Sequence, residues 1–183
     1  MAAWYGDIEE VISPAEIAKR VAELGRSISR DFVGRELVLI GVLKGSFLFM
    51  ADLCRHIELP ITCDFFGLSS YGDQTKSTGV IRITSDLKRP IAGKDVLVVE
   101  DIVDTGLTVQ YLQENLKARR AGSIKVCSLL DKPSRRVVPA QIDYLGFSVP
   151  NLFVVGYGLD FKGRYRNLPF VGKLPDDHPE IAG

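Results

Sequence analysis

Residues 96–108, VLVVEDIVDTGLT, are the stretch of this sequence that decides its fold. The first four residues form a short, β-branched and continuously apolar run, which is typical of a strand buried on both faces of a parallel sheet. Two carboxylates, Glu100 and Asp101, follow the run. Because ligands of open α/β sheets bind beyond the carboxyl ends of the strands, we expect these acidic side chains to serve function rather than packing.

A short turn of small and hydroxyl residues follows the acidic pair. Its members are Asp104, Thr105, Gly106, Leu107 and Thr108. Gly106 allows backbone conformations that a side chain would forbid, so successive amide N–H groups can converge on an anion where the next helix begins. Carboxylates beside a phosphate imply a ligand with hydroxyls or a divalent metal, as in ribose 5-phosphate. An ordinary strand with Asp104 as a helix N-cap explains the valines and one aspartate, but not the Glu-Asp pair.

The composition fits one domain without a global attraction to polyanions. The 183 residues suffice for a complete core, and 23 Lys and Arg balance 23 Asp and Glu. The formal net charge of zero gives no basic field for nucleic acid or an anionic membrane. No apolar run approaches the roughly 20 residues of a membrane helix, and the first ten residues do not resemble a signal peptide. We therefore expect a cytoplasmic protein with no nucleic-acid or membrane partner.

The cysteines and histidines give no sign of a structural metal site. Cys54, Cys63 and Cys127 are odd in number and lie in apolar surroundings, while His56 and His178 match no zinc spacing. We expect buried, reduced thiols.

Helices and strands are expected to alternate along the chain. Ser13, Pro14 and Glu16 combine an N-cap hydroxyl, a proline at the first helical position and a capping-box glutamate. The apolar stripe of that helix consists of Ile17, Val21, Leu24, Ile28 and Phe32. Further strands are expected at 37–43, 61–66, 80–84 and 125–130, and further helices at 46–55 and 108–120. The alternation predicts an α/β fold, with a mostly parallel, twisted sheet flanked by helices.

Two regions depart from this alternation. Residues 68–79, LSSYGDQTKSTG, are polar and contain glycine, which predicts a long mobile loop. From residue 137 onward the chain is rich in aromatics, glycine and proline, with a short strand expected at 153–158. We expect a single domain with a core of about residues 10–135, and a small hood lobe of about residues 136–183 that includes the N-terminal segment.

Residues 96–109, VLVVEDIVDTGLTV, resemble the signature of the type I phosphoribosyltransferases, and in detail its hypoxanthine-guanine branch. The resemblance covers about residues 37–168, with the motifs in the family's order. It implies a purine salvage enzyme, a pentosyl-transferring glycosyltransferase. Such an enzyme transfers the 5-phosphoribosyl group from phosphoribosyl pyrophosphate to hypoxanthine or guanine, giving IMP or GMP and pyrophosphate. The resemblance also implies a need for Mg²⁺ and assembly as a homodimer or homotetramer.

The same resemblance gives roles to the signature residues. Glu100 and Asp101 would engage the ribose hydroxyls and a first metal ion. The amides of residues 104–108 would hold the 5-phosphate. Asp104 would lie near the purine N7, where it takes a proton or stabilises positive charge. Leu107 stands where some relatives carry lysine. The turn would therefore bind the phosphate through backbone N–H groups, without an additional positive side chain.

A second motif, Lys44-Gly45, follows the strand 37–43 and resembles the family's pyrophosphate loop. In the family the peptide before this lysine can be cis. Arg166 resembles the arginine that grips pyrophosphate, because a forked guanidinium suits paired oxygens. Arg164 is an adjacent rival for that role, and Lys44 alone also fits a solvated turn.

The purine would be bound by Lys132, after the strand 125–130, and by the strand expected at 153–158 with the turn that follows it. By resemblance, Lys132 donates to the exocyclic oxygen of a 6-oxopurine, and Phe153 stacks on the ring. Val154 would offer its backbone to the base edge. Asp160 would help to hold a second metal ion and approach the purine amino group through its carbonyl. Without the resemblance, Lys132 fits a solvated basic turn and Phe153 fits core packing.

Ser70 and Tyr71 resemble the family's lid, which closes over the reaction centre. Closure has a chemical purpose because water would hydrolyse an oxocarbenium-like sugar.

Two alternatives to this function remain open in the sequence. A xanthine-preferring transferase would need a donor for the second oxo group. A non-catalytic regulator of the same fold would bind nucleic acid, for which the compact basic pairs are Arg119-Arg120 and Arg135-Arg136.

Overall fold

The computed structural model describes residue 6, residues 8–70 and residues 81–175. Its helices are α1 (Pro14–Asp31), α2 (Phe47–Arg55) and α3 (Leu107–Ala118), with a 3-10 turn at Pro133–Arg135. The strands are β1 (Glu9–Ile12), β2 (Leu37–Leu43), β3 (Ile61–Ser70), β4 (Ile81–Ser85), β5 (Asp95–Val103), β6 (Ser123–Asp131), β7 (Tyr144–Ser148), β8 (Val154–Val155) and β9 (Val171–Lys173).

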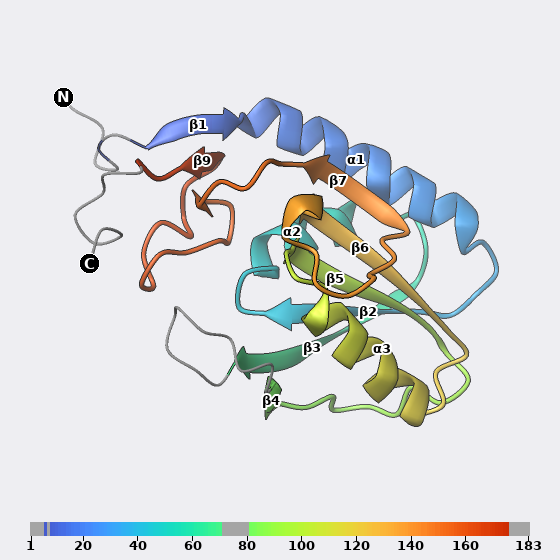
Figure 1. Ribbon diagram of the computed structural model, residues 1–183. Coiled ribbons are helices and arrows are strands. Elements are labelled where there is room, and N and C mark those ends of the chain that lie inside the picture. Colours follow the sequence, from blue (N-terminus) through green and yellow to red (C-terminus); the bar gives the residue numbers. More distant parts are fainter. Residues whose placement is uncertain (1–5, 7, 71–80, 176–183) are drawn as a thin grey trace.

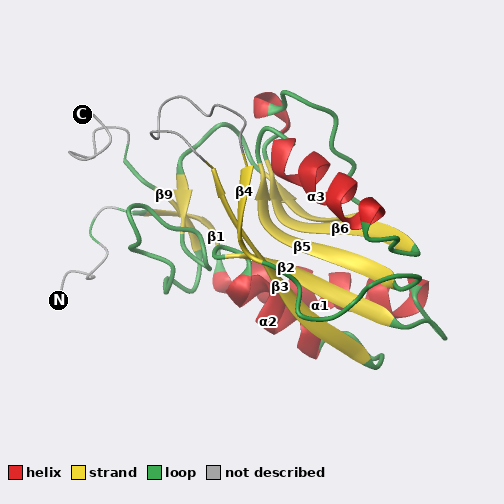
Figure 2. Ribbon diagram, turned by 90° about the horizontal axis from the view of Figure 1, so that it is seen from below, coloured by secondary structure: helices red, strands yellow, loops and turns green. Residues whose placement is uncertain are grey.

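Six strands form one twisted sheet in the order β4-β3-β2-β5-β6-β7 (Figure 1). Every neighbouring pair is parallel except β3 and β4, which are antiparallel. Figure 2 shows α1 and α2 on one face of this sheet and α3 on the other. Two separate clusters of buried apolar side chains fill these layers, one against α1 and α2 and one against α3. The expected α/β fold with a mostly parallel sheet is confirmed.

The first helix forms as its sequence predicts. The Ser13 hydroxyl accepts from the backbone N–H of Glu16, while the Glu16 carboxylate accepts from the backbone N–H of Ser13. This reciprocal pair satisfies two N–H groups that the helix itself leaves free. The whole expected apolar stripe is buried.

The strand of the signature is longer than expected. It was expected to end with the apolar run at Val99, but β5 continues through Glu100 and Asp101 to Val103. Pairing with β6 continues to Val103, whereas pairing with β2 stops at Val99. The apolar run therefore ends where β5 stops pairing with β2. From residue 100 to residue 103, β5 pairs with β6 alone, and its other edge is available to the site.

The polar segment after residue 66 is also partly strand. β3 extends to Ser70 because Leu68 pairs with Ile83 of β4, so the expected loop begins later than residue 68. The rest of that expected loop, residues 71–80, lies outside the described residues.

A second, smaller sheet in the order β1-β9-β8 forms a lobe with its own buried cluster. Figure 1 shows this sheet at the end of the molecule toward which β2 and β3 point. It joins the N-terminal segment to the C-terminal region. β7 lies within the range expected for the hood, yet it pairs with β6 of the large sheet. The strand expected at 153–158 is only β8, because Gly156 and Gly158 have positive φ and turn the chain.

The thiols are not all buried. Cys127 is buried and Cys54 partly so, but Cys63 is exposed, which corrects the expectation. Cys63 lies on the same face of β3 as Phe65, which is 38% exposed, so this face is incompletely covered. No helix of the described residues is long and apolar enough to span a membrane.

Candidate active site

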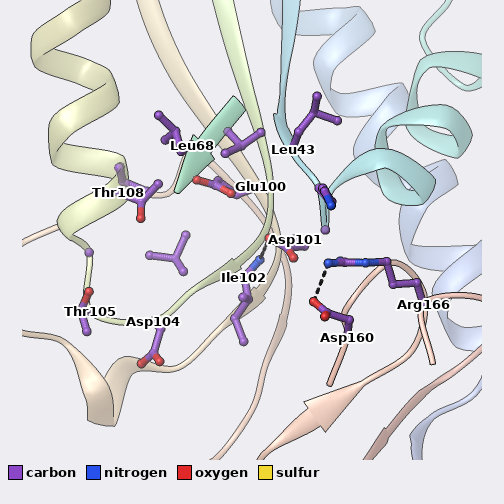
Figure 3. Close-up of a pocket in the computed structure, with 16 residues that line it drawn as sticks. Leu43, Leu68, Glu100, Asp101, Ile102, Asp104, Thr105, Thr108, Asp160 and Arg166 are labelled. Carbon is purple, nitrogen blue, oxygen red and sulfur yellow. Dashed lines mark hydrogen bonds and ion pairs between the residues drawn. The ribbon is translucent and has the colours of Figure 1, made fainter. Parts of the chain in front are cut away.

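A cleft of about 360 Å³ opens where the carboxyl ends of β2 and β5 meet the small lobe (Figure 3). The expected site residues that line it are Lys44, Gly45, Glu100, Asp101, Asp104, Thr105, Gly106, Thr108, Asp160 and Arg166. They come from the ends of two neighbouring strands and from the loop after β8. The fold therefore brings three separate parts of the sequence into one cleft.

Glu100 and Asp101 give the cleft a strongly acidic floor. Glu100 is only 4% exposed, and its Oε1 has no hydrogen-bond partner among the described residues. Burial raises the pKa of Glu100 well above its ordinary value, and the neighbouring Asp101 raises it further. Burial also raises the pKa of Asp101 to about 6, although the backbone N–H of Ile102 donates to its Oδ1 at 2.9 Å. A cation or a hydroxyl donor from a ligand would complete this floor.

The donor set suits a hard cation that also binds ligand oxygens. Within residues 8–70 and 81–175, no group of three or more His, Cys, Asp or Glu side chains could hold a metal by itself. Asp160 lies across the cleft, where its Oδ1 is 2.6 Å from Nη2 of Arg166. Mg²⁺ usually takes one or two carboxylates and completes its shell with water and substrate phosphates. The acidic floor therefore fits magnesium bound together with a phosphorylated ligand.

Asp101→Asn is expected to stabilise the protein at pH 7.5 in EDTA. In the unfolded chain Asp101 ionises at its ordinary pKa, whereas in the folded chain its pKa is about 6. The free energy of unfolding therefore falls as the pH rises from the ordinary pKa through about 6. At pH 7.5 the folded chain carries the whole cost of the buried charge. Because Asp101 keeps some exposure, we expect a gain of about 1–2 kcal/mol in the free energy of unfolding, measured by urea denaturation.

The gain should vanish near pH 4, where the folded carboxyl is protonated. The matched control is Asp86→Asn, because Arg119 lowers the pKa of Asp86 and the variant should lose stability at pH 7.5. An Asp101→Asn protein less stable than the parent at pH 7.5 would contradict this account.

Close packing of two glycines joins the small lobe to the acidic floor. A methyl group at Gly45 would overlap the Asp101 carboxylate, and one at Gly158 would overlap the carbonyl oxygen of Gly45. The Leu43–Lys44 peptide is cis, a form that the resemblance allowed but the sequence could not show. The loop that begins at Lys44 is thus in direct contact with both lobes.

Arg166, rather than Arg164, faces the cleft. Its guanidinium donates to the carbonyl of Gly158 at 2.6 Å and pairs with Asp160, so two contacts hold it at the cleft wall. Arg164 is exposed and does not line the cleft. Lys44 is exposed and also lines the cleft.

Residues 104–108, named the phosphate turn after the ligand expected there, lead into α3. Gly106 is the N-cap residue, with a φ of 89°, so the helix begins on a conformation that favours glycine. Asp104 is therefore not the N-cap, and the simpler explanation of this aspartate is wrong. Thr105, Gly106 and Thr108 line the cleft, whereas Leu107 does not. The turn offers backbone N–H groups at the positive end of a helix, which suits an anion.

Two arginines that the sequence did not place in the site contact the phosphate turn. The Nε of Arg135 lies 3.2 Å from Oδ1 of Asp104, and Nη1 of Arg136 donates to the carbonyl of Asp104 at 2.7 Å. Arg136 also forms an ion pair with Asp131 at the end of β6. The signal in the sequence was the basic run DKPSRR, but nothing in it indicated a contact across 32 residues.

These contacts also bear on the nucleic-acid alternative. Arg135 and Arg136 are in ion pairs within the chain, and Arg119 pairs with Asp86 at 2.8 Å. Arginines already paired with carboxylates are poor anchors for a phosphate backbone.

The expected purine-binding residues lie outside the lining of this cleft, apart from Asp160. Lys132 is only 8% exposed, so the interpretation as a solvated turn is wrong. Burial lowers the pKa of Lys132, while the nearby Asp104 opposes that shift. Phe153 is 47% exposed and meets the Phe161 ring edge to face at 5.4 Å, so it is not a core residue. Val154 is buried in β8.

The expected lid cannot be placed in full. Ser70 ends β3, and Tyr71 lies outside the described residues.

The chain is similar to known proteins over most of its length. The family of phosphoribosyl transferase domains matches residues 8–162. The chain is 50% identical over 169 residues to the hypoxanthine phosphoribosyltransferase of Salmonella typhimurium, covering 91% of this chain and 95% of that protein. It is also 50% identical over 169 residues to the hypoxanthine-guanine phosphoribosyltransferase of Bacillus subtilis, covering 92% and 94%. A solved hypoxanthine-guanine phosphoribosyltransferase from Bacillus anthracis has a TM-score of 0.87 and 47% identity, covering 91% of this chain and 98% of that one.

Proposed function

This chain belongs to the phosphoribosyltransferase family, in its hypoxanthine-guanine branch, and from that premise we propose how its residues carry out purine salvage. The enzyme transfers the 5-phosphoribosyl group from phosphoribosyl pyrophosphate to hypoxanthine or guanine, with IMP or GMP and pyrophosphate as products. The observation that carries the assignment of residues is the cleft itself. It holds the buried Glu100 and the partly buried Asp101 beside the turn that begins α3 and opposite Arg166.

The phosphoribosyl group binds along β5 and the turn that follows it. Glu100 and Asp101 accept hydrogen bonds from the ribose hydroxyls, which explains the unpartnered Oε1 of Glu100. The amides of residues 104–108 hold the 5-phosphate at the start of α3. When bound, Mg²⁺ would add positive charge at the pyrophosphate oxygens, held by Glu100 and Asp101 at one position and Asp160 at a second.

The pyrophosphate leaves from the side of the cleft that Lys44, Gly45 and Arg166 form. A bond forms from a purine nitrogen to the anomeric carbon as the bond from that carbon to the pyrophosphate oxygen breaks. The electron pair leaves with pyrophosphate. Lys44 and Arg166 stabilise that negative charge, which is electrostatic catalysis directed at charge developing in the transition state.

Asp104 manages the positive charge on the base. Its carboxylate is 37% exposed at the rim of the cleft. Its negative charge raises the pKa of the nearby Lys132. As the purine attacks, the carboxylate accepts the imidazole proton at N7 or stabilises the positive charge there. Lys132 then lies on the side of the exocyclic oxygen, where an ammonium donates to an oxo group but not to the amino group of adenine. Phe153 offers an exposed face for stacking, and Val154 offers backbone groups at the base edge.

Ser70 and Tyr71 form the lid that excludes water in this proposal.

The enzyme works in the cytoplasm as a homodimer or homotetramer. Phe47 and Phe65 are 40% and 38% exposed, which leaves apolar side chains available to a second copy.

Lys132→Met tests the proposed reading of the base. Methionine keeps an unbranched apolar stem in a buried position but removes the donor. Because a hydrogen bond to a charged group is worth about 1.5–3 kcal/mol, kcat/KM for hypoxanthine should fall roughly 10- to 100-fold, with little change for adenine. The measurement is pyrophosphate release with hypoxanthine, guanine, xanthine and adenine offered separately.

Lys125→Met is the matched control. Lys125 lies in β6, the strand that Lys132 follows, and its ammonium contacts the rings of Phe32 and Tyr144 away from the cleft. Its base preference should match that of the parent. A Lys132→Met enzyme that still prefers hypoxanthine over adenine to the parent's extent would remove Lys132 from base recognition.

A further inference from the structure

The segment after β6 is bound to the back of the phosphate turn by a row of hydrogen bonds. The backbone N–H of Lys132 donates to the carbonyl of Val103 at 3.0 Å. The backbone N–H groups of Val137 and Val138 both donate to the carbonyl of Thr105, at 2.9 and 3.1 Å. Between these contacts, Nη1 of Arg136 donates to the carbonyl of Asp104 at 2.7 Å.

These bonds act on the peptides whose N–H groups form the anion site. The carbonyl of Asp104 shares a peptide with the N–H of Thr105, and the carbonyl of Thr105 shares one with the N–H of Gly106. A donor at the carbonyl polarises the peptide and makes its N–H a stronger donor, most of all when the donor is charged. Hydrogen bonds at the back of the turn therefore strengthen the N–H groups at its front.

Arg136 is held firmly for this role. Its side chain is 19% exposed, and it forms an ion pair with Asp131, whose side chain is 14% exposed. A methyl group at Gly106 would lie 2.5 Å from the carbonyl oxygen of Val138 and 3.1 Å from Cδ of Arg136. The arginine stem thus lies close beside Gly106, and its guanidinium is bonded to the turn at the carbonyl of Asp104.

The turn carries no cation of its own. Its residues 104–108, DTGLT, contain one carboxylate and no basic side chain, and Leu107 does not reach the cleft. Arg136 supplies a positive charge at the back of this turn without occupying the space of the ligand, because it does not line the cleft.

We propose that Arg136 is a positioning residue of the 5-phosphate site: from behind the turn, it fixes the Asp104 peptide and strengthens the N–H donors of Thr105 and Gly106. This inference rests on the proposed function, in which that turn binds the 5-phosphate. Arg136 acts through the backbone and does not touch the phosphate.

The test compares IMP with inosine, which lacks only the phosphate. Dissociation constants of both are measured by calorimetry for the parent, Arg136→Ala and Arg136→Lys. The parent should bind IMP more tightly than inosine. Arg136→Ala should weaken IMP binding roughly 10- to 100-fold, the range typical of removing a residue that orients a binding group, while inosine changes less than about threefold. Arg136→Lys keeps the charge without the fork and should give an intermediate ratio.

Arg119→Ala is the matched control, because Arg119 is also a partly buried arginine paired with an aspartate, but outside the cleft. It should lose stability without changing the ratio of IMP to inosine affinity. A general structural loss would weaken both ligands together, so the ratio separates positioning from folding. If Arg136→Ala does not fold, Arg136→Lys carries the test.

Two failures are distinguishable. If the parent itself binds IMP no better than inosine, the proposed phosphate site is wrong. If the parent prefers IMP and both Arg136 variants keep that preference, the phosphate site stands and the role of Arg136 is overturned.

Discussion

Asp104→Asn is expected to lower turnover by roughly 100- to 10,000-fold while phosphoribosyl pyrophosphate still binds, the range that general-base assistance provides. Asparagine keeps the shape of the side chain, and its oxygen can still accept from Arg135. The backbone carbonyl that Arg136 binds is unchanged. The substitution therefore removes the ability to take a proton or balance a positive charge, and little else.

The measurement is the single-turnover rate of IMP formation, together with equilibrium binding of phosphoribosyl pyrophosphate. Asp86→Asn is the matched control, since Asp86 also pairs with an arginine near the surface but lies outside the cleft. Its turnover should equal that of the parent. Unchanged turnover in Asp104→Asn would exclude this carboxylate from catalysis.

Gly45→Ala is expected to lower kcat/KM by roughly 100-fold or more, because a displacement of about 1 Å in a catalytic group can cost that much. The added methyl group would overlap the Asp101 carboxylate, so either the carboxylate or the loop must move. Gly158 packs closely on the carbonyl of Gly45, so the loop at Gly45 has little room to move. The ribose site and the pyrophosphate loop would then lose their relative position.

Steady-state kinetics with phosphoribosyl pyrophosphate as the varied substrate measures this loss. Gly34→Ala is the control, because its methyl group meets nothing within 4 Å although its φ is 74°, and Gly34 does not line the cleft. It should lose some stability and keep its activity. Parent-like kcat/KM in Gly45→Ala would show that the contact with Asp101 is not needed for catalysis.

Local patterns in the sequence predicted most of the fold. The capping residues of α1, the apolar run of β2 and the run at 96–99 each act through neighbours in the chain, so their outcome is readable from the sequence. The end of β5 was not readable, because it depends on where β2 diverges and β6 continues. Strand ends set by pairing are properties of the sheet rather than of the strand.

The residues of the candidate site also fall into two groups: those identified from local motifs, and those that only the fold reveals. Residues in dense motifs, such as Glu100 and Asp101, were identified from the sequence and lie together in the cleft. The sequence alone did not show which of Arg164 and Arg166 faces the cleft. The turn at Gly158 decides this, because its carbonyl accepts a hydrogen bond from Arg166. Arg136 was missed because its contact with the phosphate turn joins the ends of two adjacent strands, and a basic run alone does not show which carbonyl it meets.

Phosphoribosyl transfer to a 6-oxopurine is measured by following both products when the purified protein is given phosphoribosyl pyrophosphate, Mg²⁺ and one base at a time. With hypoxanthine or guanine, we expect equal amounts of pyrophosphate and of IMP or GMP, and far slower product formation with adenine. Absence of both products with every base, or turnover of adenine as fast as that of hypoxanthine, would contradict this expectation.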